Sequence, residues 1–175
     1  MLQTVGIIVV LLIAGILIFA ALRPSRFRIE RSAGIKAPPE KIFPYINDFH
    51  QWPAWSPWEK LDSGLQRTFS GPASGTGAVY EWQGNKKVGS GRMEITDATP
   101  ASRVLIKLDF LSPFEAHNTA EFTLAPQQGG GTRVTWAMYG PSPYISKLMG
   151  LVFNMEKMVG TSFEEGLTTL KSLVE

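Results

Sequence analysis

The side chains that can carry a proton are few and scattered along this chain. It has no cysteine, which excludes a thiol nucleophile, a cysteine zinc site and a disulfide. Its two histidines, His50 and His117, are far apart in sequence, so we expect no metal centre and no cofactor. General acid–base chemistry, such as forming an enolate beside a carbonyl, needs a base and a donor for the oxygen. The other candidates for those roles are Asp48, Glu59, Glu81, Asp109, Glu115 and Glu156.

Among these residues, the catalytic candidates are His50, His117 and Glu156. His117 lies in a predicted strand, where alternation turns it outward and Asn118 inward. His50 lies in an aromatic turn that we place near the mouth of a cavity. Neither histidine has an evident relay partner in the sequence, so the pattern gives each candidate a proton-carrying side chain but no complete site.

Aromatic and methionine side chains form the second set with possible function. Tryptophan and methionine suit irregular apolar ligands, although the same residues also fill ordinary cores. Both interpretations stay open, and tryptophans between Trp52 and Trp58 are also suited to a bilayer interface. The predicted ligand-binding residues are Trp52, Trp55, Trp58, Trp82, Met93, Trp136, Met138, Met155, Glu156 and Phe163.

A long amphipathic helix is predicted to position this set. The segment from Ser142 to Glu175 has Ser142 as a candidate N-cap and Pro143 at the first helical position. Its apolar residues recur at helical spacing, which predicts one face packed against a sheet. The stripe comprises Ile145, Leu148, Val152, Met155, Val159, Phe163, Leu170 and Leu173.

Glu156 and Gly166 interrupt the apolar arc of this helix. A carboxylate and a missing side chain on a core face suggest that the core is open there. Two interpretations of Glu156 remain: it bends to the surface or pairs with an arginine of the sheet, or it meets a ligand in a cavity under the helix.

The middle of the chain predicts an antiparallel sheet. Strands are expected at 27–37, 78–83, 88–99, 102–110, 116–125 and 132–139, joined by short turns. A short helix is expected from Pro39, and residues 47–58 are expected to form a packed turn or a second short helix. Strands and helices are segregated along the chain, so the predicted class is α+β: a curved sheet of six to seven strands that grips the C-terminal helix.

The N-terminal segment reads as a transmembrane helix. Val5–Leu22 carries no charged residue, and its eighteen residues span about 27 Å at the helical rise. A signal peptide is the alternative, but its basic leading region and cleavage site are missing. The predicted organisation is an anchor over residues 1–24, crossing the cell membrane once through residues 5–22, and a domain over 25–175. Four arginines after the span, Arg23, Arg26, Arg28 and Arg31, place that domain in the cytoplasm.

Charge and glycine patterns exclude other classes. The formal net charge is +2, and basic residues do not cluster with exposed aromatics, so we expect no nucleic-acid partner. The glycine-rich stretch 71–77 lacks the lysine and the spacing of a phosphate-binding loop.

Several stretches resemble one known superfamily over residues 27–175. The chain is similar to the START-like (SRPBCC) proteins, in particular their polyketide cyclase/dehydrase-like branch, which have the helix-grip fold. The resemblance implies that fold with an added membrane anchor, but no universal catalytic motif. The stretches that carry it are 35–38 leading into 41–43, 52–58, 89–95, 131–136 and 163–167.

Three functions follow from the resemblance and the residues together. The first is a membrane-anchored domain that binds a hydrophobic small molecule or lipid between the sheet and the C-terminal helix. The second is a cyclase or dehydrase-type enzyme with Glu156 or a histidine as base. The third is a non-catalytic interaction module for another membrane protein, which a solid core would favour.

Overall fold

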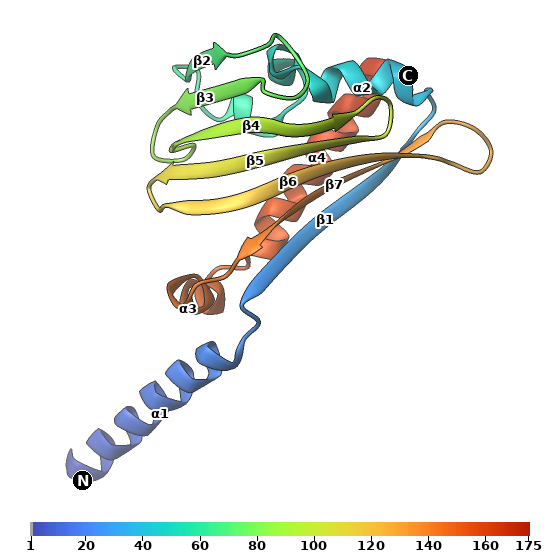
Figure 1. The fold of residues 1–175 in the computed structure, drawn as a ribbon. Coiled ribbons are helices and arrows are strands. Elements are labelled where there is room, and N and C mark those ends of the chain that lie inside the picture. The colour runs from blue at the N-terminus through green and yellow to red at the C-terminus, as the bar shows by residue number, and fades with distance from the viewer. Residues whose placement is uncertain (1) are drawn as a thin grey trace.

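A seven-stranded antiparallel sheet forms the body of the protein (Figure 1). The computed structural model describes residues 2–175; Met1, which falls in the predicted anchor segment, lies outside them. The strand order is β1-β7-β6-β5-β4-β3-β2, so only β1 is out of chain order at its edge. This confirms the predicted α+β helix-grip architecture. The strands are β1 (Arg26–Ile35), β2 (Gln66–Ser70), β3 (Val79–Gln83), β4 (Ser90–Thr99), β5 (Arg103–Ser112), β6 (Ala116–Pro126) and β7 (Thr132–Pro141).

Strand β2 was not predicted from the sequence, for a reason visible in the burial of its residues. Gln66, Arg67 and Thr68 are exposed, and Phe69 is only partly buried, because this five-residue strand forms one edge of the sheet. Without two buried faces or a clear alternation it gives no strand pattern.

Between β1 and β2 the chain crosses the inner face of the sheet in short helical pieces. Helix α2 (Pro39–Asn47) is followed by two 3-10 helices, η1 (Phe49–Ala54) and η2 (Pro57–Lys60). Pro53 lies inside η1 and Pro57 opens η2, and proline prevents these turns from joining into one longer helix. The prediction of packed turns over residues 47–58 is confirmed.

The prediction of a single helix from Ser142 is wrong. The chain forms α3 (Tyr144–Val152) and α4 (Met155–Val174), which are separated at Phe153 and Asn154. Asn154 starts α4 as its N-cap: its side-chain oxygen accepts a hydrogen bond from the Lys157 backbone N–H at 2.9 Å. Ser142 caps nothing and instead donates its backbone N–H to the Ser25 carbonyl.

Only the second of these helices is gripped by the sheet. Helix α4 lies mainly across β1, with the face formed by Phe163, Leu167, Leu170 and Val174 buried. Each such side chain contributes roughly 1.5–3 kcal/mol by leaving water. The predicted stripe fails outside this face, because Ile145, Val152, Met155 and Leu173 are exposed.

Helix α1 (Leu2–Leu22) projects away from the sheet (Figure 1). The segment Gln3–Leu22 is long and apolar enough to cross a membrane. Most of its large apolar side chains are exposed, and its last turns contact α3. Helix α1 therefore contributes little to the core of the domain.

Candidate functional site

The space between the sheet and α4, where a ligand is predicted, is filled by aromatic rings. Trp136 on β7 stacks on Phe163 of α4 with ring centroids 4.2 Å apart, and on Phe122 of β6 at 4.9 Å. Trp52 and Trp55 of the η1 segment meet each other at 5.0 Å and both meet Trp136 edge-on. These five rings are buried, so they form one continuous packed layer.

The other predicted ligand-binding residues fall into two groups. Trp82, Met93 and Met138 lie on the inner face of the sheet and are buried, and Trp58 packs its ring on Trp136 at 5.5 Å. Met155, by contrast, is 48% exposed at the start of α4. The tryptophans near η1 do not form a bilayer-facing surface, because Trp52 and Trp55 point into the core.

Gly166 marks close packing and not an opening. A Cβ atom built there would lie 2.9 Å from Trp136 Cζ3 and 3.1 Å from Pro57 Cδ. Glycine lets the α4 backbone approach the aromatic layer, which is why a poor helix former stands on the buried face. The interpretation of an open core at this position is wrong.

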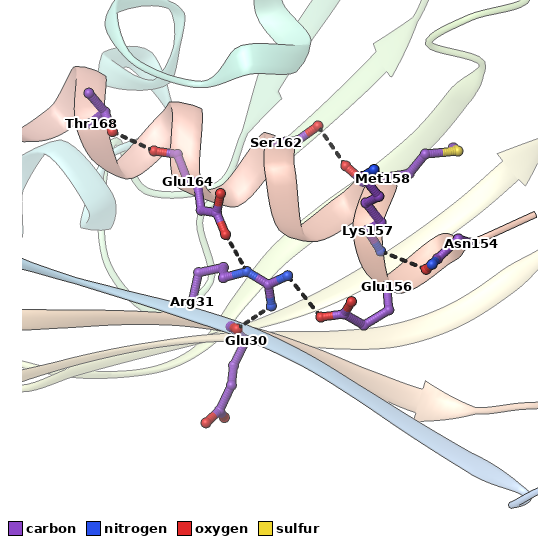
Figure 2. Close-up of polar contacts among 9 residues, drawn as sticks. All are labelled: Glu30, Arg31, Asn154, Glu156, Lys157, Met158, Ser162, Glu164 and Thr168. Atoms are coloured by element: carbon purple, nitrogen blue, oxygen red, sulfur yellow. Dashed lines mark hydrogen bonds and ion pairs between the residues drawn. The ribbon is translucent and has the colours of Figure 1, made fainter.

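Glu156 is held by an arginine of the sheet (Figure 2). Arg31 on β1 donates from Nη2 to Glu156 at 2.8 Å and from Nε to Glu164 at 2.6 Å. Its hydrogen bonds to Glu156 and then Glu164 raise the Arg31 pKa. Both carboxylates are largely exposed, so the clamp ties α4 to β1 at the surface. Of the two interpretations of Glu156, pairing with a sheet arginine is confirmed.

His50 lies in a surface hollow at the opposite end of the sheet from α1. The hollow holds about 250 Å³ and is lined by Phe49, His50, Phe69, Ala78, Val79 and the loop of residues 70–73. The His50 ring stacks on Phe69 at 4.2 Å, and its Nδ1 lies 2.8 Å from Asp48 Oδ1. Asp48 is thus a hydrogen-bond partner of His50 that the sequence spacing did not indicate.

His117 also has a carboxylate partner, on the outer face of the sheet. Its Nδ1 lies 2.7 Å from Asp109 Oδ1, and its Nε2 lies 3.3 Å from Glu115. Burial acts to raise the Asp109 pKa, but hydrogen bonds from His117 and Lys107 outweigh it and the pKa is lowered. The hydrogen bond to Asp109 raises the pKa of His117. The outward orientation predicted for His117 is confirmed.

A signal for the Asp109–His117 pair was present in the sequence. A turn between predicted strands ending at Phe110 and starting at Ala116 brings Asp109 opposite His117, as the register has it. The three catalytic candidates nevertheless lie apart: His50 at η1, His117 on β6 and Glu156 on α4. Among residues 2–175, no group of three or more carboxylate and histidine side chains is arranged to hold a metal ion.

Glu59, in η2, is a buried carboxylate on the side of the sheet that η2 covers. Its side chain, 4% exposed, accepts hydrogen bonds from the Tyr80 hydroxyl and from Arg67 Nε, each at 2.6 Å. Burial, with the hydrogen bond to Glu59, raises the pKa of Tyr80 well above its usual range. Both carboxylate oxygens are occupied, so Glu59 ties η2 to β2 and β3. In the sequence nothing set it apart from the other acids.

Solved structures of low sequence identity share this fold. A di-domain ARO/CYC protein, BexL from the BE-7585A biosynthetic pathway, aligns with a TM-score of 0.64 at 16% identity. The alignment covers 89% of this chain and 52% of the BexL chain. The Aha1 dimer from Colwellia psychrerythraea gives 0.60 at 18% identity, with coverage of 85% and 96%. Protein CV1439 from Chromobacterium violaceum gives 0.58 at 17% identity, with coverage of 87% and 99%.

Sequence comparison assigns the family. No curated protein sequence matches the chain. Residues 26–175 match the family described as polyketide cyclase/dehydrase and lipid transport, from the first residue of β1 to the C-terminal residue. The helix-grip fold agrees with this match, and the chain belongs to the polyketide cyclase/dehydrase and lipid transport family.

Proposed function

We propose that this protein is a membrane-anchored START-like domain that acts by binding a partner protein and not by catalysis. The observation that supports this proposal is the aromatic layer between the sheet and α4. A cyclase of this fold needs room for a substrate and an acid–base group facing it. Here the space holds Trp52, Trp55, Trp136, Phe122 and Phe163, and the three catalytic candidates lie at the surface.

The anchor in this proposal is α1, with residues 5–22 in the bilayer and residues 25–175 as the attached domain. The four arginines that predict a cytoplasmic domain are not equivalent. Arg28 and Arg31 lie within β1 and are paired with carboxylates of the domain. Arg23, and Arg26 at the first position of β1, are exposed close to the span, and the predicted orientation depends on these two arginines.

The hollow beside His50 is the surface that we assign to the partner. It lies at the sheet end remote from α1, where an anchored domain faces the aqueous phase. Apolar Phe69 and the short, exposed edge strand β2 border it. An edge strand offers unpaired backbone groups to an incoming chain, and a solved relative of the fold, the Aha1 protein, is described as a dimer.

A second candidate function is binding of an apolar small molecule or lipid. The family description includes lipid transport, and a bilayer anchor keeps a domain close to apolar ligands. This function requires the aromatic layer to open, because the rings now occupy the site. A ligand retained by the purified protein would favour it.

The experiment is photo-crosslinking in the native membrane. A photoreactive residue is placed at Ser70, which lines the hollow, and separately at Lys107, an exposed position on the outer face of the sheet. The proposal predicts a protein adduct of one defined mass from position 70 and none from position 107. Equal, diffuse labelling from both positions would contradict it.

A further inference from the structure

Helix α3 presents an apolar surface that the rest of the domain does not cover. None of its side chains is buried, and Ile145 and Val152 are 62% and 79% exposed. At helical spacing the apolar residues fall on one arc, while Ser146, Lys147 and Gly150 occupy the other side. The exposed apolar surface continues through Phe153 into Met155. A contiguous patch of this kind marks a contact surface, unlike isolated exposed residues.

Contacts with α1 fix the level of α3 along the proposed span. The Tyr144 hydroxyl donates to the Leu17 carbonyl at 3.1 Å, and Ala20 is fully buried. On the polar side, Lys147 Nζ lies 3.4 Å from Ser25 Oγ. Helix α3 therefore lies beside the last turns of α1. The end of a span of this length coincides with the boundary between hydrocarbon and headgroups.

The direction of α3 fits that boundary. In Figure 1 α1 runs across the picture while α3 is seen nearly end-on, so the two helices lie crosswise. With α1 crossing a bilayer, α3 lies along its surface. An amphipathic helix in that position buries its apolar arc at the level of the headgroups and acyl chains.

The β5–β6 turn reaches the same end of the sheet. The register pairs Phe110 with Ala116 and Arg26 with Pro141, so this turn and the exit from α1 share one end. The turn exposes Leu111 and Phe114, at 59% and 65%. The β3–β4 turn, between Gln83 and Ser90, adds exposed Lys86 and Lys87 at this end.

We propose that α3 and the β5–β6 turn, with Leu111 and Phe114, form a membrane-surface contact that seats the domain on the bilayer. This inference rests on the proposed anchor. The occupant is lipid because the apolar surface of α3 is continuous with that of α1. Exposed lysines at the same end suit anionic headgroups. The contact would fix the domain in one orientation, with the His50 hollow directed away from the bilayer.

The test uses the absence of cysteine in the natural chain. Single cysteines are introduced into the full-length protein at exposed positions: Val152→Cys, Phe114→Cys, Val10→Cys and Gln128→Cys. Each carries an environment-sensitive fluorophore, and the proteins are reconstituted in vesicles of phosphatidylcholine and phosphatidylglycerol. Lipids with a nitroxide at the headgroup or deep in the acyl chain act as depth-resolved quenchers. Far-UV circular dichroism checks that each labelled protein is folded.

We expect labels at 152 and 114 to lose most of their fluorescence to the headgroup nitroxide and to emit at shorter wavelength than the label at 128. The label at 10, in the middle of α1, should be quenched by the deep nitroxide. Position 128, in the loop at the far end of the sheet, is the matched control.

The outcomes separate the two proposals. Deep quenching at 10 with no headgroup quenching at 152 and 114 would overturn the membrane contact and leave the anchor intact. No quenching at 10 would overturn the anchor, and with it the contact. Quenching at 152 alone would restrict the contact to α3 and overturn the part assigned to the turn.

Discussion

The buried Glu59 carboxylate allows a quantitative test of how η2 is attached to strands β2 and β3. In a Glu59→Ala variant, the Tyr80 hydroxyl, on a residue only 3% exposed, loses its acceptor. An unsatisfied buried polar group costs about 1–3 kcal/mol. Arg67 loses a charge-assisted hydrogen bond, but its side chain is 30% exposed and water replaces part of that interaction, which leaves about 1 kcal/mol.

Together these losses predict about 3 kcal/mol of lost unfolding free energy. For a folded unit of this size, that lowers the midpoint of thermal unfolding by about 6–12 °C. The assay is urea and thermal unfolding of the full-length protein in detergent micelles, followed by tryptophan fluorescence. The tryptophans of the aromatic layer report on the region that η2 covers.

Two further variants control the comparison. Tyr80→Phe removes one hydrogen bond and keeps the Glu59–Arg67 pair, so it should cost about 1 kcal/mol. Asp97→Ala breaks an exposed pair with Arg103 and should change little. A loss below about 1 kcal/mol for Glu59→Ala, or a loss equal to that of Asp97→Ala, would refute the reasoning.

Three other predictions concern single side chains. Gly166→Ala should destabilise the protein by about 1 kcal/mol in the same unfolding assay, because overpacking against Trp136 exceeds the gain in helix propensity; a more stable variant would contradict the packing account. Glu156→Gln should keep the fold and partner crosslinking, and its effect on the unfolding midpoint should shrink in high salt, since the Arg31 clamp is exposed; lost crosslinking with an intact fold would reinstate Glu156 as a functional residue. In an NMR titration, His117 should have a pKa above its ordinary 6.5, and the Asp109→Asn variant should lower that pKa. The contribution of this pair to folding stability is present below pH 6.5 and is lost as the pH rises through the raised pKa of His117. A His117 pKa that is unchanged in Asp109→Asn would contradict this prediction.

The architecture was predictable from local patterns, whereas its edges and breaks were not. Strands β4 to β7 alternate because one face of each packs into the hydrophobic core. Strand β2 lies at the edge and lacks that signal. The break between α3 and α4 depends on Asn154 acting as a cap, which competes with a continuous apolar spacing in the sequence.

The candidate site was predicted as a set of residue types but not as an arrangement. Sequence spacing indicated that Trp136 and Phe163 face inward, but it does not distinguish a ring that lines a cavity from a ring that packs on another ring. The carboxylate partners of His50 and His117 depend on turn geometry and strand register. The apolar residues of α3 were assigned to the core because a single helix was assumed from Ser142. In the structure α3 lies beside α1, and its apolar arc is exposed.

The central claim is that the helix-grip interior is filled by its own side chains and that the domain acts at the membrane without a ligand there. Native mass spectrometry of the full-length protein, extracted from its host membranes in mild detergent, tests it most directly. The account predicts the mass of the bare chain across independent preparations. A stoichiometric apolar molecule of defined mass, retained by the wild-type protein across those preparations, would contradict it.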